Sequence, residues 1–264
     1  MKVAFIGGGN MAGALIGGML QAGFKPDEIE VLEIDAARGA ELTARHSVTS
    51  HRQPGDWLQP SETIVLAVKP QQMSDAAASI KPYLTRPLVL SIAAGVRAQT
   101  IADSLATGNI VRAMPNMPAL IRAGISAAVA LPEVSDAERK GAEKILGAVG
   151  AVMWLDDEAM LDAVTALSGS GPAYVFYFIE AMQNVALEMG FDKSQARALT
   201  MHTFVGAAQL AMQSHESAAA LREKVTSKGG TTAAALASFE RDKVDEAIAR
   251  AVRAAAARAR ELGS

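Results

Sequence analysis

The stretch Lys2-Val3-Ala4-Phe5-Ile6-Gly7-Gly8-Gly9-Asn10-Met11-Ala12-Gly13 decides the fold of the N-terminal half. Its apolar run is long enough for one buried strand, and the run breaks into glycines that lead straight into a helical pattern. In such a strand–turn–helix unit, Gly7 allows the tight turn, Gly9 lets the backbone approach a pyrophosphate, and Ala12 keeps helix and strand close. Free N–H groups at the start of the helix attract phosphate. The stretch therefore predicts a dinucleotide-binding turn.

Strand-like and helix-like segments alternate from this turn to about residue 155. The predicted strands are Val3–Ile6, Glu30–Ile34, Thr63–Val68, Leu88–Ala93 and Asn109–Met114. The predicted helices are Met11–Ala22, Ala36–Arg45, Gln71–Leu84, Ala98–Ala106 and Asp136–Ala148. Nearly continuous apolar strands are typical of a sheet covered on both faces. The pattern predicts an α/β fold with a Rossmann-type doubly wound, mainly parallel sheet, to which Ile125–Ala130 and Val149–Leu155 add further edge strands that can run antiparallel.

The strand signal disappears after Asp156, and the C-terminal half is predicted to be all-α. Its predicted helices are Ala159–Leu167, Ala173–Met189, Lys193–Gln213, Ser217–Val225, Thr231–Arg241 and Val244–Leu262. We expect Asp192 and Ser217 to cap helices and Pro172 to lie in a first turn. We therefore predict two domains, a dinucleotide-binding domain at 1–156 and an all-α substrate and dimerisation domain at 157–264. Because Tyr174–Ala186 is apolar around most of its circumference, we expect it to be buried in a subunit interface.

The composition excludes several classes of function. The net charge of -3 gives no electrostatic footprint for nucleic acid, and a chain without cysteine has neither disulfides nor thiolate chemistry. No uninterrupted run reaches the ~18 apolar residues of a membrane helix. The four histidines do not pair with carboxylates at metal-ligand spacing, so no metal site is predicted. We expect a cytoplasmic protein that binds neither nucleic acid nor membrane.

The end of the second predicted strand is where a dinucleotide's ribose is usually recognised. Glu33 and Asp35 both fall there. A carboxylate at this place accepts hydrogen bonds from a free ribose diol and repels a 2′-phosphate, whereas the nearby Arg38 could pair with that phosphate. These residues leave the choice between NAD and NADP open, and solvated charges at a strand end are the alternative.

Two later strands end in segments with small residues that leave room for a flat ring. They are Val65-Leu66-Ala67-Val68-Lys69-Pro70 and Ser91-Ile92-Ala93-Ala94-Gly95-Val96, and ligands of open α/β sheets bind at such carboxyl ends. Lys69 is a candidate catalytic residue, although a lysine that faces solvent or phosphate is the stronger interpretation.

Three loops also stand out. Two prolines in 114–118 predict that Asn116 is held at a fixed place. The segments 167–174 and 225–232 each place hydroxyl residues and glycines before a helix, where free N–H groups suit a carboxylate. Ordinary helix capping explains one such loop, but two in the same half favour a substrate anion.

Taken in order, these segments closely resemble pyrroline-5-carboxylate reductases over nearly the whole chain. The residues that carry the resemblance are Phe5-Ile6-Gly7-Gly8-Gly9-Asn10-Met11, Ala67-Val68-Lys69-Pro70, Ser91-Ile92-Ala93-Ala94-Gly95-Val96, Arg112-Ala113-Met114-Pro115-Asn116, the run from Asp162 to Tyr174, and Ser227-Lys228-Gly229-Gly230-Thr231-Thr232. The resemblance implies reduction of 1-pyrroline-5-carboxylate to L-proline by NADP(H), possible use of NAD(H), and homodimers built by the C-terminal helices and assembled further into a decamer.

The resemblance also assigns site residues. The cofactor residues that it implies are Gly7, Gly9, Asn10, Met11, Ala67, Lys69, Pro70 and Ala94. Their neighbours Val68 and Gly95, and Asp35 from the ribose position discussed above, complete the predicted cofactor site. The implied substrate residues are Gly230, Thr231, Thr232 and, more weakly, Glu158, with the Thr232 hydroxyl near the imine nitrogen as the catalytic group.

The chain departs from the family pattern at Lys224, at Lys228 and at the Glu33–Asp35 strand end, where the family usually has small polar residues suited to a 2′-phosphate. The last departure puts the usual preference for NADPH in doubt. Two other functions remain as alternatives: a non-catalytic NAD(P)-sensing module, and an enzyme like the 3-hydroxyacid dehydrogenases. The second needs a lysine on a long helix after a glycine-rich turn, and this chain has none between Lys144 and Lys193.

Overall fold

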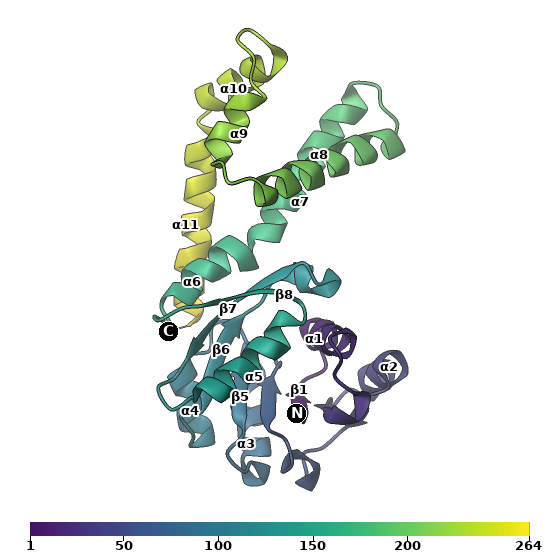
Figure 1. Ribbon diagram of the computed structural model, residues 1–264, viewed down its shortest axis with the longest axis vertical. Coiled ribbons are helices and arrows are strands. Elements are labelled where there is room, and N and C mark those ends of the chain that lie inside the picture. The colour runs from purple at the N-terminus through teal and green to yellow at the C-terminus, as the bar shows by residue number, and fades with distance from the viewer. Residues whose placement is uncertain (264) are drawn as a thin grey trace. The chain divides into compact units, whose positions relative to one another are not determined.

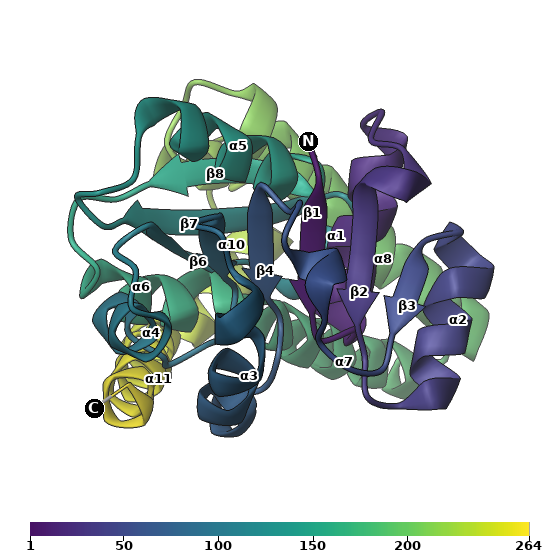
Figure 2. The ribbon, with the colours of Figure 1, turned by 90° about the horizontal axis from the view of Figure 1, so that it is seen from below.

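The computed structural model describes residues 1–263, and an eight-stranded sheet organises their N-terminal part (Figure 1). The strands are β1 (Val3–Ile6), β2 (Ile29–Leu32), β3 (Thr49–His51), β4 (Thr63–Leu66), β5 (Leu88–Ser91), β6 (Ile110–Met114), β7 (Gly124–Ala130) and β8 (Gly150–Trp154). Their order is β3-β2-β1-β4-β5-β6-β7-β8, so the chain winds outward in opposite directions from β1 and β4 (Figure 2). The predicted doubly wound, mainly parallel sheet is confirmed.

Two details of the sheet differ from the sequence prediction. The short strand β3 was not predicted, because Thr49, Ser50 and His51 are polar and carry no apolar period. The antiparallel pairing of β7 with β6 is confirmed, but β7 is an internal strand, and β8 pairs parallel to β7 at the edge. Strand direction depends on the path of the connecting helix, which local periodicity does not encode.

Helices cover both faces of the sheet. Those of the N-terminal part are α1 (Asn10–Gln21), α2 (Ala36–His46), α3 (Met73–Ile80), α4 (Ala98–Leu105), α5 (Asp136–Gly147) and α6 (Met160–Val164). Apolar residues of α1, α2 and α5 pack on one face of the sheet, and those of α3 and α4 pack on the other. Short 3₁₀ segments complete this part at Pro26–Glu28, Asp56–Leu58, Pro70–Gln72, Lys81–Tyr83 and Met117–Ile121. A two-faced core of Val, Ile, Leu and Ala therefore forms with few aromatic residues.

The predicted helix Gln71–Leu84 is shorter in the structure. Its α-helical part, α3, runs from Met73 to Ile80, with 3₁₀ turns on either side. Pro70 and Pro82 lie in those turns, and a proline at 82 cannot donate the hydrogen bond that would extend the helix. A proline near each end thus explains the difference.

The chain divides into two compact units. One contains residues 1–170 and the segment from Ala255 onward, and the other contains residues 171–254. The predicted domain division between 156 and 157 follows the change from mixed to all-α sequence and stays a prediction about domains. The second unit, called the helical unit below, comprises α7 (Gly171–Glu188), α8 (Lys193–Gln213), α9 (Ala218–Lys224), α10 (Thr231–Arg241) and the first part of α11 (Val244–Leu262).

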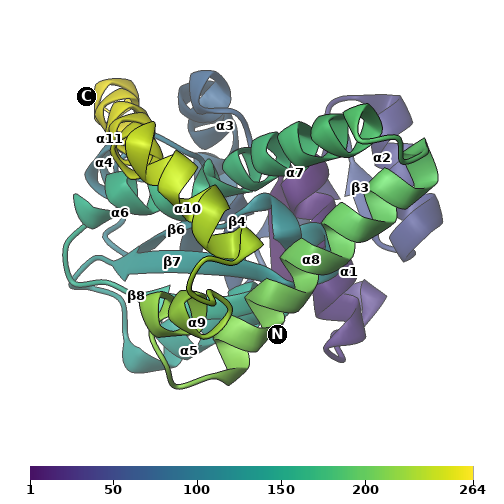
Figure 3. The same cartoon turned by 90° about the horizontal axis from the view of Figure 1, so that it is seen from above.

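Helix start signals in the helical unit behave as predicted. Asp192 caps α8 by accepting from the Gln195 N–H, Ser217 caps α9 through the Ala220 N–H, and Pro172 lies in the first turn of α7. Helices α7 and α8 pack against each other (Figure 3). Local capping chemistry thus sets where these helices begin.

The helical unit buries almost nothing within one chain. Of residues 171–254, all of which the structure describes, only Ala196 and Thr200 are buried. On α7, Phe176 is 55% exposed and Tyr177 is 72% exposed, within the segment expected to form an interface. None of the helices in residues 1–263 is both long and apolar enough to cross a membrane.

Candidate functional site

The glycine turn joins β1 to α1. Gly7 has a φ of +98°, and a Cβ atom placed on it would lie 2.8 Å from the Ala67 carbonyl oxygen, so both conformation and space require glycine there. A Cβ on Gly9 would meet no protein atom within 4 Å. Gly9 is the N-cap of α1 and supplies no capping side chain. The turn therefore offers an uncapped helix N-terminus and open space beside it, as an approaching pyrophosphate requires.

A cavity of about 610 Å³ lies beside the turn. Predicted cofactor residues in its wall are Gly7, Gly9, Asp35, Ala67, Val68 and Lys69. They come from the carboxyl ends of β1, β2 and β4, which are neighbours in the sheet. This is the point where the strand order reverses and where open α/β sheets bind ligands.

The other predicted cofactor residues lie outside this cavity wall. Asn10 is exposed and lines a second groove of about 640 Å³ along α1 and α2, whereas Met11 is half-buried against the core. Pro70 begins the 3₁₀ turn before α3. Ala94 and Gly95 lie in the loop between β5 and α4, where Gly95 has a φ of +76°.

Glu33 rather than Asp35 is directed at the glycine turn. The Glu33 carboxylate accepts hydrogen bonds from the Gly8 N–H at 2.9 Å and from the Asp35 N–H at 2.9 Å. Asp35 caps α2 by accepting from the N–H groups of Ala37 and Arg38. The two carboxylates thus have different roles, because Glu33 faces the glycine turn and Asp35 caps the start of α2.

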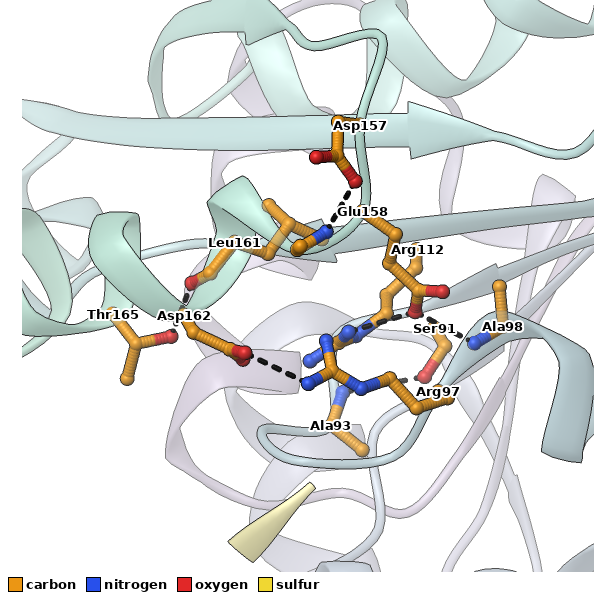
Figure 4. Close-up of polar contacts among 11 residues, drawn as sticks. Ser91, Ala93, Arg97, Ala98, Arg112, Asp157, Glu158, Leu161, Asp162 and Thr165 are labelled. Carbon is orange, nitrogen blue, oxygen red and sulfur yellow. Dashed lines mark hydrogen bonds and ion pairs between the residues drawn. The ribbon is translucent and has the colours of Figure 1, made fainter. Parts of the chain in front are cut away.

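A network of charged side chains lies at the carboxyl ends of β5 and β6 (Figure 4). Glu158 Oε1 accepts from Arg112 Nη1 at 2.7 Å and from the Ala98 N–H at 2.8 Å, so it caps α4. Arg97 Nη2 donates to Asp162 Oδ2 at 2.7 Å. Arg112 and Asp162 are each only 3% exposed, and each has an opposite charge as partner. Glu158, a predicted substrate residue, therefore also holds the start of α4.

Sequence reasoning missed Arg97, Arg112 and Asp162 as members of this network. One signal was available, because Arg112 interrupts an otherwise apolar buried strand and a buried charge requires a partner. The partner of Arg112 is Glu158, which lies 46 residues later in the sequence, and local spacing could not predict this pair.

The loop that contains Gly95 is closed from a distant part of the chain. A Cβ on Gly95 would lie 3.0 Å from the carbonyl oxygen of Leu262, at the end of α11. Arg97 Nη2 comes within 3.3 Å of a Cβ placed on Gly263. The loop between β5 and α4 is thus fixed by the charged network on one side and by the C-terminal turn on another.

The predicted loop at 167–174 is wrong for its first residues, which are helical, whereas the predicted helix start near Pro172 is confirmed. Thr165–Gly169 is a π-helical turn that directly follows α6, and Ser170 alone separates it from α7. The Ser168 hydroxyl donates to the Val164 carbonyl, and the Ser170 N–H donates to the Thr165 carbonyl. Glycine and serine in this run accommodate a widened turn instead of ending the helix.

Asn116 stabilises this π-helical turn. Its Nδ2 donates to the Ser168 carbonyl at 3.1 Å, and its Oδ1 accepts from the Ile125 N–H at 2.9 Å. The expectation that Asn116 is held at a fixed place is confirmed. Both polar atoms of its side-chain amide thus bond to the protein's own backbone.

The segment at 225–232 does keep a free helix start. Gly230 is the N-cap of α10 and provides no side-chain cap, and Gly229 has a φ of +73°. Within residues 1–263, no hydrogen-bond partner is found for the hydroxyls of Thr231 and Thr232. This segment therefore presents N–H donors and two hydroxyls, a set that suits a carboxylate.

The two lysine departures near this segment are both on the surface. Lys224 Nζ pairs with Glu216 Oε2 at 2.7 Å, and Lys228 is exposed next to Gly229. Within the described chain, no group of three or more histidine, aspartate or glutamate side chains is placed to hold a metal ion. The segment 225–232 can therefore bind a ligand through hydrogen bonds and through the positive N-terminal end of α10.

Comparisons with known proteins match both halves of the chain. A family model described as pyrroline-5-carboxylate reductase dimerisation matches residues 158–262, and one described as NADP oxidoreductase, coenzyme F420-dependent, matches residues 2–95. The pyrroline-5-carboxylate reductase of Pseudomonas aeruginosa is 39% identical over 263 residues, covering 99% of this chain and 96% of that protein.

Two solved structures of pyrroline-5-carboxylate reductases are also similar to this chain. A pyrroline-5-carboxylate reductase from Coxiella burnetii has a TM-score of 0.93 and 36% identity, covering 100% of this chain and 98% of that one. A Plasmodium falciparum pyrroline carboxylate reductase, crystallised with NADP bound, has a TM-score of 0.90 and 27% identity, covering 100% and 98%.

Proposed function

The chain belongs to the pyrroline-5-carboxylate reductase family, and we propose how its residues carry out the reaction of that family, the reduction of 1-pyrroline-5-carboxylate to L-proline by NAD(P)H in proline biosynthesis. The uncapped start of α1, with open space at Gly9, is the observation on which the proposed cofactor site depends. The alternatives of a sensing module and of a 3-hydroxyacid dehydrogenase find no support in the comparisons.

The cofactor is held by the sheet. The α1 N-terminus takes the pyrophosphate through its N–H groups, and the segments Ala67–Pro70 and Ala94–Gly95 flank the nicotinamide at neighbouring strand ends. When bound, NAD(P)H supplies the hydride. The charged network holds Ala98, the first residue of α4 after the second segment, through Glu158 and Arg112, which supports a constant ring position.

The substrate is held by the start of α10. The N–H groups of Thr231 and Thr232 bind the carboxylate, since the Gly230 N–H already donates to the Ser227 carbonyl, and the Thr232 hydroxyl forms a hydrogen bond at the imine nitrogen. The hydride adds to the imine carbon, the C=N π electrons pass to nitrogen, and the protonated nitrogen becomes the secondary amine of proline. This step requires the imine carbon within ~3.5 Å of the hydride donor.

No strong acid–base pair is required for this reaction. A ring imine is basic enough to take its proton from solvent, so Thr232 needs only to orient and stabilise the protonated nitrogen. Glu158 is a weaker candidate for substrate contact. Its Oε1 atom already accepts two hydrogen bonds, which leaves Oε2 for that role.

The dimerisation model that matches residues 158–262 makes an oligomer the expected form. We propose a homodimer in which the exposed apolar side chains of α7, including Phe176 and Tyr177, are covered by a second copy. Further assembly into a decamer and a cytoplasmic location are parts of the same proposal.

An absorbance assay tests the proposed function. The protein is mixed with 1-pyrroline-5-carboxylate and either NADH or NADPH, and loss of the reduced nicotinamide is followed. Thr232→Ala should lower kcat about 10- to 100-fold, because a hydrogen bond to a charged group is lost, while cofactor binding stays near normal. The control Thr203→Ala removes a hydroxyl bonded to the Leu199 carbonyl on α8 and should leave kcat unchanged. Unchanged turnover in Thr232→Ala removes that residue from its role, and no consumption of either cofactor by the unaltered enzyme refutes the reductase function.

A further inference from the structure

A buried carboxylate stands at the ribose end of the proposed cofactor site. Glu33 directly follows β2 and is only 5% exposed. Its two oxygens accept from the N–H groups of Gly8 and Asp35, and these bonds fix the side chain against the glycine turn. Glu33 also lines the cavity of about 610 Å³ that contains the turn. A fixed negative charge therefore faces the place where the adenosine ribose of a dinucleotide lies in this fold.

The middle glycine of the turn makes this approach possible. A Cβ on Gly8 would lie 3.1 Å from Glu33 Oε2 and 2.5 Å from Leu42 Cδ1, the latter too close for any real side chain. A Cβ at position 8 would displace the Leu42 side chain and would crowd the Glu33 carboxylate by a few tenths of an ångström. Gly8 and Glu33 are thus matched to each other, and the placement of the carboxylate is built into the turn.

The other charged side chains of the cavity do not offset the negative charge of Glu33 enough to make this place bind a 2′-phosphate. The cavity wall also contains the carboxylates of Asp35 and Asp75 and the cations of Arg38 and Lys69. Arg38 Nη1 lies 3.6 Å from Glu33 Oε2, so this guanidinium is already paired with the buried carboxylate. A 2′-phosphate that recruited Arg38 would leave Glu33 without its counter-ion in a nearly buried position, which is costly.

We propose that Glu33 selects a dinucleotide whose adenosine ribose carries a free 2′-hydroxyl, so that this reductase uses NADH more efficiently than NADPH. The proposal rests on the function proposed above. An ionised carboxylate offers about four acceptor positions, and Gly8 and Asp35 occupy two of them, which leaves capacity for a ribose hydroxyl. The same carboxylate repels a 2′-phosphate, and a like-charge contact near a protein surface costs enough for at least about tenfold discrimination.

The unaltered enzyme provides the first test. We expect kcat/KM with NADH to exceed kcat/KM with NADPH by about tenfold or more. Equal values, or a preference for NADPH, would overturn the assignment of Glu33 but leave the reductase function intact. If neither cofactor is oxidised, the function itself fails, so the two failures are distinguishable.

A binding test needs no turnover. Adenosine 5′-monophosphate and adenosine 2′,5′-bisphosphate are compared as competitors that displace NADH, followed by the fluorescence of the bound nicotinamide. We expect the bisphosphate to compete about tenfold more weakly or worse, since only it carries the 2′-phosphate. A bisphosphate that competes as well as the monophosphate, or better, contradicts the proposal.

Variants then locate the effect. Glu33→Ser should shift the NADH-to-NADPH ratio of kcat/KM towards NADPH by about tenfold. The ratio is informative even if Glu33→Ser is less stable, because both values come from the same preparation. The matched control is Glu30→Gln, which neutralises a carboxylate of the same strand that pairs with His51 at 3.0 Å, away from the cavity wall, and the ratio should stay unchanged. An unchanged ratio in Glu33→Ser would assign the selectivity elsewhere.

Discussion

The sheet-containing unit and the helical unit differ in how much of their apolar surface is buried within one chain. The sheet is packed on both faces, so that side chains such as Phe5, Ile64 and Leu90 are fully buried within one chain. In residues 171–254 only Ala196 and Thr200 reach that state, although α7 is rich in large apolar side chains. Hydrophobic burial is the main favourable term in folding. The first unit therefore has its core in one chain, whereas the second has the composition of a core without the second layer that would cover it.

This difference assigns different tasks to the two regions. A unit with a complete core can hold small groups at fixed places, as it does for the glycine turn and for Glu33. We expect a unit whose apolar face is open to gain stability when another copy covers that face. Cofactor selectivity should thus respond to single side chains in the sheet unit, while the order of the helical unit should depend on association.

The strongest test of the comparison is Phe176→Asp on α7. Phe176 is 55% exposed in the single chain, and a charge on this face would be buried without a partner on association. We expect the association constant to fall by a factor of about 10³ or more, measured as a change in mass by light scattering. Phe176→Leu keeps the face apolar and should retain the oligomer. A Phe176→Asp protein with unchanged mass would show that this face is not an interface.

The next test separates fold from ligand inside the sheet unit. Gly7→Ala should destabilise the protein by about 2–4 kcal/mol, because alanine disfavours positive φ and its Cβ would meet the Ala67 carbonyl. Gly9→Ala should lower stability by only about 1 kcal/mol or less, since the added methyl meets no protein atom and only the preference for glycine at the N-cap is lost. That methyl should nevertheless weaken cofactor binding about tenfold or more, because it stands beside the uncapped start of α1. Thermal unfolding and cofactor titration distinguish these results, and equal effects on both quantities in the two variants would contradict the assignment.

A smaller effect is expected in the charged network. Asp162→Asn leaves the half-buried Arg97 with a neutral partner and should lower stability by about 1–3 kcal/mol in chemical unfolding. The matched control is Asp156→Asn at an exposed position, with an expected change within about 0.5 kcal/mol. If the network positions the loop at Gly95, the KM for the cofactor should also rise in Asp162→Asn, and a change in stability alone would limit the network to the fold.

The smallest effect concerns pH. Burial, and to a lesser degree the neighbouring Arg45, lowers the pKa of His46 below its ordinary value of 6.5. The unfolded chain therefore binds this proton more readily than the folded protein does, and stability falls as the pH decreases through 6.5. His46→Gln should remove this contribution, worth less than about 1 kcal/mol, in unfolding measured at about pH 5.5 and about pH 7.5. An identical pH dependence in the variant would show that His46 does not contribute.

Local patterns were sufficient for most of the fold and for the cofactor turn. The apolar runs at β1, β4 and β5 and the glycines after β1 predict both elements and their chemistry, because strand period and turn conformation depend on neighbouring residues. The same local reasoning failed at Ser168 and Gly169, where serine and glycine suggested a loop and the chain stays helical. The widened turn there is stabilised by Asn116, which lies 52 residues from Ser168 in sequence.

The amino-acid sequence by itself determined where most strands and helices lie, that Gly7 must be glycine, and that two carboxylates stand near the ribose end. Only the tertiary structure decided that Glu33 faces the glycine turn while Asp35 caps α2, and that Arg97 and Arg112 find Asp162 and Glu158. The physical reason is the distance along the chain over which each kind of interaction acts. Backbone conformation is set by contacts over a few residues, whereas the direction of a buried charge is set by the partners that the whole fold brings to it.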